Sequence, residues 1–145
     1  MKKYLIHRIR TVSTKDSGGL SFIEASKDIP FKIKRVYYIH QVPRGVKRGG
    51  HAHKELEQLL FCPYGKIEIV VDDGNEKEKY VLDSPDKGLY IGNGVWRDMI
   101  WHQDNSVLCV AVSRYYDEED YIRDYKQFIE LVIEGYWDDK KNHKL

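Results

Sequence analysis

The sequence lacks the means to form a disulfide framework or to cross a membrane. Only two cysteines occur in 145 residues, and Cys62 and Cys109 each lie inside an apolar run, which indicates buried thiols. No stretch approaches the roughly 20 apolar residues of a membrane-spanning helix, and residues 1–10 lack the apolar core of a signal peptide. The sequence therefore predicts a soluble, cytoplasmic protein with no membrane segment.

A large net charge is also missing, because 24 lysines and arginines nearly balance 23 aspartates and glutamates, giving +1. A nucleic-acid-binding protein is usually basic overall, so we expect no nucleic-acid partner. The charges are unevenly placed, however: residues 29–54 hold seven Lys or Arg, three His and no acidic residue, whereas residues 117–139 hold nine Asp or Glu. The basic segment predicts a pocket for an anion.

Short apolar runs separated by turn signals occupy most of the chain. They predict strands at residues 4–9, 20–24, 35–40, 56–62, 66–71, 79–82, 89–91, 95–101 and 107–113. Strands at this spacing are typical of an antiparallel sandwich or barrel, and Asp73-Gly74 predicts a hairpin. Beyond residue 113 the apolar period becomes helical, which predicts an amphipathic helix over residues 117–134 with Asp117 as its cap. The length favours a single domain over residues 1–137, and we expect residues 138–145 to be a disordered tail.

The basic segment ends in the histidine-containing sequence Gly49-Gly50-His51-Ala52-His53. The glycines before it and the apolar run after it favour a strand over a helix. On a strand, side chains two residues apart share a face, so His51 and His53 point the same way, as does Glu57 if the strand is unbroken. The sequence therefore predicts an imidazole pair in the wall of the anion pocket.

The spacing around these histidines resembles the first cupin motif. Gly45 is followed after five residues by His51-Ala52-His53, then after three by Glu57 and after seven by Gly65. Metal-binding cupins usually supply a further histidine from a second motif, but the expected positions hold Arg97 and Met99. Guanidinium ligates no metal and Met is a poor ligand for hard or borderline ions, so we expect no metal in this pocket.

A more specific resemblance runs from about residue 3 to residue 134. Residues 35–39, 48–54, 56–58, 72–74, 82–85, 88–92, 95–96 and 115–123 together resemble the dTDP-4-keto-6-deoxyglucose 3,4-ketoisomerases. The resemblance implies an all-β fold with a C-terminal helix, namely the cupin jelly roll (double-stranded β-helix). It also implies a dTDP-linked 4-keto-6-deoxy sugar as substrate, no cofactor, and a homodimer with exchanged N-terminal strands.

Three residues are predicted to carry the chemistry. The carbonyl moves from C4 to C3 when a proton is removed from C3 and returned to C4, and histidine has a pKa suited to both transfers. The resemblance makes His51 this base. His53, on the same face, is expected to orient the sugar or donate to a developing oxyanion. Alternation in residues 35–40, together with the resemblance, places Tyr37 inward as a hydrogen-bond donor or, alternatively, as a core residue.

Five further residues are predicted to bind the substrate. Arg35 and Arg48 are candidates for the diphosphate or a sugar oxygen, because the guanidinium fork matches both. Glu57 is expected in the pocket as a hydrogen-bonded residue. Arg97 is expected to face the sugar and to influence whether C4 takes the gluco or galacto configuration, with Arg favouring gluco. Ser17, in an N-terminal loop, is expected to contribute to that choice.

Three other functions fit parts of the same pattern. A metal-dependent cupin enzyme would use His51, His53 and Glu57 as ligands. A sugar-nucleotide 3,5-epimerase would remove protons from C3 and C5. A non-catalytic sensor would bind the nucleotide sugar without turning it over.

Overall fold

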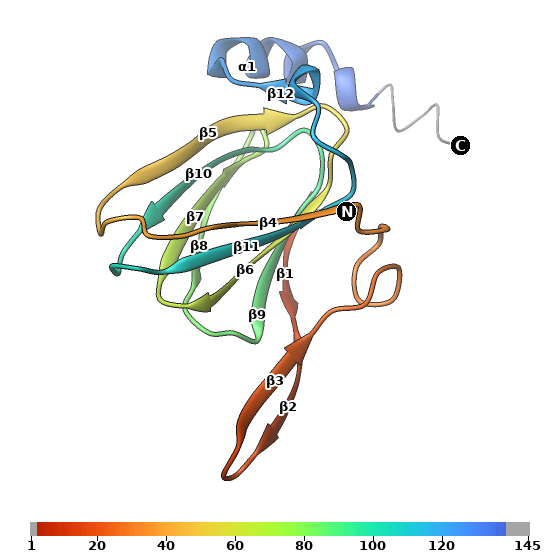
Figure 1. Cartoon of the computed structure of the whole chain (residues 1–145). Coiled ribbons are helices and arrows are strands. Elements are labelled where there is room, and N and C mark those ends of the chain that lie inside the picture. The colour runs from red at the N-terminus through yellow and green to blue at the C-terminus, as the bar shows by residue number, and fades with distance from the viewer. Residues whose placement is uncertain (1–2, 139–145) are drawn as a thin grey trace.

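Two five-stranded antiparallel sheets face each other in the computed structural model, which describes residues 3–138 (Figure 1). The first sheet runs in the order β1 (Tyr4–Arg8), β9 (Lys87–Ile91), β6 (Gln58–Tyr64), β11 (Val107–Val112) and β4 (Arg35–Ile39). The second runs in the order β12 (Tyr121–Ile122), β5 (Lys47–His53), β10 (Trp96–Trp101), β7 (Ile67–Asp72) and β8 (Lys77–Leu82). The predicted jelly roll is confirmed.

The core lies between the two sheets and follows the period-two alternation of the strands. In β4, Tyr37 and Ile39 pack against the core, whereas Val36 and Tyr38 are 59% and 64% exposed. The inward direction predicted for Tyr37 is therefore confirmed. Fully buried side chains such as Trp101 fill the centre, and each large apolar side chain removed from water stabilises the fold by about 1.5–3 kcal/mol.

A hairpin of β2 (Arg10–Thr14) and β3 (Gly18–Phe22) extends away from the two sheets (Figure 1). Every residue of β2 is exposed, and the apolar side chains of Val12 and Leu20 are 58% and 63% exposed. β2 was not predicted, because Arg-Thr-Val-Ser-Thr contains only one large apolar residue and does not alternate between apolar and polar residues. The hairpin pairs only with itself among the described strands.

The strand predicted over residues 56–62 is displaced along the chain, because β6 begins at Gln58 and continues to Tyr64. Pro63 has no backbone N–H to donate to a neighbouring strand, but it lies where the strand pairing does not require that donor. The pairing of β6 with β9 ends at Phe61, and the pairing with β11 is irregular between Cys109 and Val107. The hairpin predicted at Asp73-Gly74 is confirmed between β7 and β8, with Gly74 at a positive φ of 94°.

The helix predicted over residues 117–134 is wrong in its first part. The structure has a 3-10 turn, η1 (Glu118–Asp120), then β12, and only then α1 (Tyr125–Ile133). Asp117 caps η1, and Asp124 caps α1 by accepting from the Lys126 amide. Tertiary contacts overrode the helical period, because the two residues of β12 form a ladder with His53 and Ala52 of β5.

α1 covers the end of the second sheet beside β5 and β12 (Figure 1). Its buried Phe128 contacts Trp96, and Trp137 beyond the helix donates from Nε1 to the Lys54 carbonyl at 3.0 Å. Between residues 3 and 138, no helix is long and apolar enough to cross a membrane. Apart from Asp138, the expected disordered tail lies outside the described residues.

Candidate active site

A cavity of about 300 Å³ opens between the two sheets, where β4 and β5 face the segment that follows β11. It is lined by Arg35, Tyr37, Ile39, Arg48, Gly49, His51, Met99, Tyr116, Tyr121 and Arg123. The cavity thus brings together four of the residues predicted from sequence, namely His51, Tyr37, Arg35 and Arg48. Three guanidinium groups and no carboxylate line it, which matches the predicted anion pocket.

The shape of β5 depends on its two glycines. Gly49 and Gly50 have φ values of 91° and 72°, a left-handed conformation that other residues adopt only with strain. A Cβ atom on Gly49 would lie 2.9 Å from the carbonyl oxygen of Arg97, so a side chain does not fit there. The pairing of β5 with β10 shifts register at this point, where His51 lies opposite Arg97.

His51 is held as a neutral imidazole. Burial lowers its pKa to about 2, and the positive charge of Arg97 adds to this effect, followed by His53 and Arg123. The ring lies edge-on to His53 at a centroid distance of 5.0 Å and packs against Tyr121 at 5.2 Å. A neutral imidazole has a free lone pair, so His51 is in the form that accepts a proton, but a pKa of about 2 makes it a much weaker base than the near-neutral group expected from the sequence.

His53 lies deeper than His51 and is 1% exposed. Its Nδ1 is 3.0 Å from a carboxylate oxygen of Asp120, and Tyr121 packs over its ring at 4.5 Å. Burial lowers the pKa of His53 to about 4, although the hydrogen bond to Asp120 acts in the opposite direction. Within the described part of the chain, its Nε2 has no hydrogen-bond partner.

Arg97 is completely buried behind the cavity and does not line it. Its guanidinium donates to the side-chain oxygen of Gln58 and, at 2.9 Å, to the carbonyl of Val95. Burial lowers its pKa to about 10, opposed by Tyr37, Tyr121 and Asp120, so it stays cationic at neutral pH. Among residues 3–138 no three His, Cys, Asp or Glu side chains converge as metal ligands. A permanent cation beside His51 makes this donor set a poor match for a metal ion.

The phenol of Tyr37 lines the cavity together with His51. Burial raises its pKa above the usual value, against the opposing positive charges of Arg97 and Arg35, so the hydroxyl keeps its proton. The Arg35 guanidinium lies 5.3 Å from the Tyr37 ring centroid and 5.7 Å from that of Tyr116. The cavity thus offers a neutral donor, a neutral acceptor and a fixed positive charge.

Four predicted site residues do not line the cavity. His53 and Arg97 are buried behind it, so the structure does not place Arg97 at the surface expected to face the sugar, and Glu57 and Ser17 lie elsewhere in this subunit. β5 ends at His53, so Glu57 does not continue the histidine face; its carboxylate accepts from the Tyr90 hydroxyl at 2.5 Å. Ser17 lies in the exposed turn between β2 and β3 and is not among the residues that line the cavity. Neither residue lines the cavity of its own chain.

Sequence reasoning missed five residues of the site: Gln58, Tyr116, Asp120, Tyr121 and Arg123. The last three were assigned to a helix, although their side chains meet β5 across the fold. Arg123 lies over the Tyr121 ring at 4.2 Å and binds Glu118 through two hydrogen bonds of 2.7 and 3.0 Å. The only signal was the resemblance of residues 115–123 to the ketoisomerases, which did not separate their roles.

A larger hollow of about 730 Å³ lies under α1 and beside the β7–β8 turn. Its described lining includes Asp73, Glu76 and Asp138, but no histidine and no arginine. It lacks the acid–base groups of the smaller cavity, which we therefore treat as the site.

Comparison with known proteins identifies the family to which the chain belongs. Residues 2–133 match the model of the family described as FdtA: WxcM-like, C-terminal. The chain belongs to this family. A curated relative, the TDP-4-oxo-6-deoxy-α-D-glucose-3,4-oxoisomerase of Aneurinibacillus thermoaerophilus, is 50% identical over 115 residues, which cover 79% of this chain and 83% of the relative. This WxcM-like protein is thus a member of the sugar-nucleotide 3,4-ketoisomerases.

Solved ketoisomerases share its fold. QdtA from Thermoanaerobacterium thermosaccharolyticum, in complex with TDP, is 42% identical with a TM-score of 0.85, covering 88% of this chain and 93% of QdtA. A histidine-to-asparagine mutant of QdtA was solved in complex with TDP-4-keto-6-deoxyglucose. A 3,4-ketoisomerase from Helicobacter canadensis is 40% identical with a TM-score of 0.87, covering 91% of this chain and 98% of that protein.

Proposed function

We propose that this protein converts dTDP-4-keto-6-deoxy-D-glucose to the corresponding dTDP-3-keto-6-deoxy-hexose without a cofactor. The observation that carries the proposal is the neutral His51 imidazole in the wall of a cavity with a fixed cation behind it. The name of the 50% identical relative and the ligands of QdtA support the same substrate class. The reaction would supply a 3-keto sugar nucleotide to an amino-transfer step.

The reaction moves two protons within the sugar. His51 removes the proton on C3 and returns it to C4, so an enediolate forms and collapses on one face of the ring. Arg97 and the Tyr37 hydroxyl stabilise the negative charge of that intermediate. The hydroxyl proton must also pass from the C3 oxygen to the C4 oxygen. We assign this second transfer to His53, whose unpartnered Nε2 is buried behind the cavity wall beside the His51 ring.

The cationic rim is suited to the rest of the substrate. Arg35, Arg48 and Arg123 present guanidinium forks to the diphosphate, and Tyr116 offers an aromatic face at the cavity mouth. Arg97 lies behind the cavity wall, so it would act on the sugar through its charge, and we propose that it favours the gluco configuration at C4. A large H4–H5 coupling in the NMR spectrum of the product would identify gluco, and a small one galacto.

The decisive test is incubation of the purified protein with dTDP-4-keto-6-deoxyglucose in deuterated water, followed by NMR. We expect a 3-keto product with C5 unexchanged. Deuterium at C5 would instead indicate a 3,5-epimerase. The His51→Asn variant should bind the substrate with unchanged affinity and show no turnover. Equal loss of binding and activity would contradict a purely catalytic role, whereas unchanged cellular function would indicate a sensor.

We also propose a homodimer that exchanges the β2–β3 hairpin. Val12 and Leu20 are exposed on the hairpin, and Val36 and Tyr38 are exposed on the edge strand β4, so each subunit offers apolar surface for the other to cover. Exchange would carry Ser17 towards the partner's cavity. Light scattering should give a dimer for the native protein and a monomer for Leu20→Asp. A monomeric native protein would refute the exchange.

A further inference from the structure

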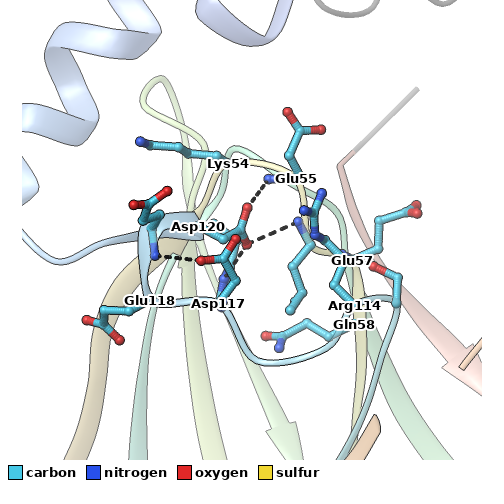
Figure 2. A network of polar contacts seen from close by, with 12 residues as sticks. Lys54, Glu55, Glu57, Gln58, Arg114, Asp117, Glu118 and Asp120 are labelled. Carbon is cyan, nitrogen blue, oxygen red and sulfur yellow. Dashed lines mark hydrogen bonds and ion pairs between the residues drawn. The ribbon is translucent and has the colours of Figure 1, made fainter. Parts of the chain in front are cut away.

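Asp120 is a buried carboxylate that joins the segment after β11 to the end of β5. It is 6% exposed and lies at the end of η1. One oxygen accepts from the Glu55 amide at 2.7 Å, and the other accepts from the Leu56 amide at 3.3 Å and lies 3.0 Å from Nδ1 of His53. Figure 2 shows this carboxylate directed at the backbone of Glu55.

These contacts fix the protonation pattern of His53. Two backbone amides already donate to the carboxylate, and an ionised carboxylate can only accept, so Nδ1 of His53 must carry the hydrogen. In a neutral imidazole the other nitrogen is then the acceptor. That nitrogen, Nε2, is buried and finds no partner among residues 3–138. A buried acceptor without a donor is costly, so this nitrogen requires a donor that the chain does not supply, either a water or a hydroxyl of the bound sugar.

Charged neighbours act on His53 from several elements. Arg97 of β10 and Arg35 of β4 disfavour a second proton on the ring, and Asp120 is the carboxylate that favours it. His51 and Tyr121 contact the ring without carrying a charge that would help. A transient imidazolium at His53 therefore depends on Asp120.

We propose that Asp120 is a positioning residue for the isomerisation, which holds His53 as the Nδ1–H tautomer and stabilises its imidazolium during oxygen-to-oxygen proton transfer. In that step the C3 hydroxyl gives its proton to Nε2 of His53 as the C3 carbonyl forms, and Nε2 returns the proton to the C4 oxygen. No proton or electron is gained or lost overall. This inference rests on the proposed function above.

The first test needs no variant. A ¹⁵N–¹H long-range NMR spectrum of the native protein should show His53 protonated at Nδ1 and unprotonated at Nε2 at pH 7.5. Protonation at Nε2 would overturn the inference. Because this measurement does not use the reaction, it separates failure of this inference from failure of the proposed function, which would appear as no turnover of the keto sugar.

The second test is a double-mutant cycle of Asp120→Asn and His53→Gln. Asp120→Asn should lower kcat by about 10- to 100-fold with KM changed less than about twofold, because general acid–base action contributes about 10²- to 10⁴-fold and only its orientation is impaired. In the His53→Gln background the same change should cost no more than about twofold further, because residues that act as a unit are not additive.

Asp117→Asn is the matched control. Asp117 lies on the same segment as Asp120 (Figure 2) and caps η1 by accepting from the Glu119 amide at 3.0 Å. It should leave kcat unchanged. A merely structural Asp120 would instead lower the melting temperature and activity equally in both His53 backgrounds, and that result would overturn the inference.

Discussion

The buried histidine pair predicts a stability that falls steeply below neutral pH. A histidine in the unfolded chain has a pKa of about 6.5, whereas burial lowers the pKa of His53 to about 4 and that of His51 to about 2. The unfolded chain therefore binds protons in a pH range where the folded protein does not. Stability is full above pH ~6.5 and is lost progressively as the pH falls below that value towards the two folded-state pKa values.

The magnitude follows from proton linkage. At pH 5 an unfolded histidine is ~97% protonated and folded His53 only ~10%, which corresponds to a loss of about 2 kcal/mol relative to pH 8. His51 contributes a similar amount, so the pair lowers the free energy of unfolding by about 4 kcal/mol. This is a large part of the stability of an ordinary domain.

Urea unfolding, followed by tryptophan fluorescence at pH 8, 6 and 5 and at one protein concentration, measures this loss. His53→Gln and His51→Asn should each remove about 2 kcal/mol of the pH dependence, whatever they do to stability at pH 8. His102→Gln, at an exposed histidine, is the matched control and should keep the full dependence. Identical pH curves for the native protein and the two buried-site variants would refute the reasoning.

Four further predictions concern the cavity and the residues behind it. Tyr37→Phe should lower kcat/KM by about tenfold in the NMR turnover assay with little change in melting temperature, because it removes one donor to the enediolate; an unchanged kcat/KM would make Tyr37 a core residue only. Gln58→Leu should lower the free energy of unfolding by about 2 kcal/mol in urea, because it removes the side-chain oxygen that accepts from the buried Arg97 and leaves only the Val95 carbonyl. Arg123→Gln should raise KM with kcat retained in steady-state kinetics. Chelation of the native protein should leave turnover unchanged. Chelator-sensitive turnover would support a metal-dependent enzyme instead.

Most of the fold was predictable because burial follows local alternation. The apolar runs that became β1, β4, β7, β10 and β11 are each close to the length of the final strand. The exposed β2 carries no such alternation. The helix was extended too far because Tyr121 and Ile122 fit its apolar period, yet they are held by the β5 ladder, a contact that no local pattern encodes.

The site was predictable where its residues share one strand. His51 and His53 follow the period of β5, and Tyr37 follows that of β4. Gln58, Asp120 and Arg123 reach the site from elsewhere along the chain, so their roles depend on long-range packing. Glu57 failed as a pocket residue because β5 stops at His53, and sequence alone did not mark that break.

The buried guanidinium of Arg97 has a consequence for the working range of the enzyme. Its charge does not change between mildly acidic and mildly alkaline solution, and neither does the uncharged state of the imidazole opposite it. The electric field across the reacting carbons is thus constant over that interval. At the acid end, turnover should cease when the molecule denatures, not when its base is titrated.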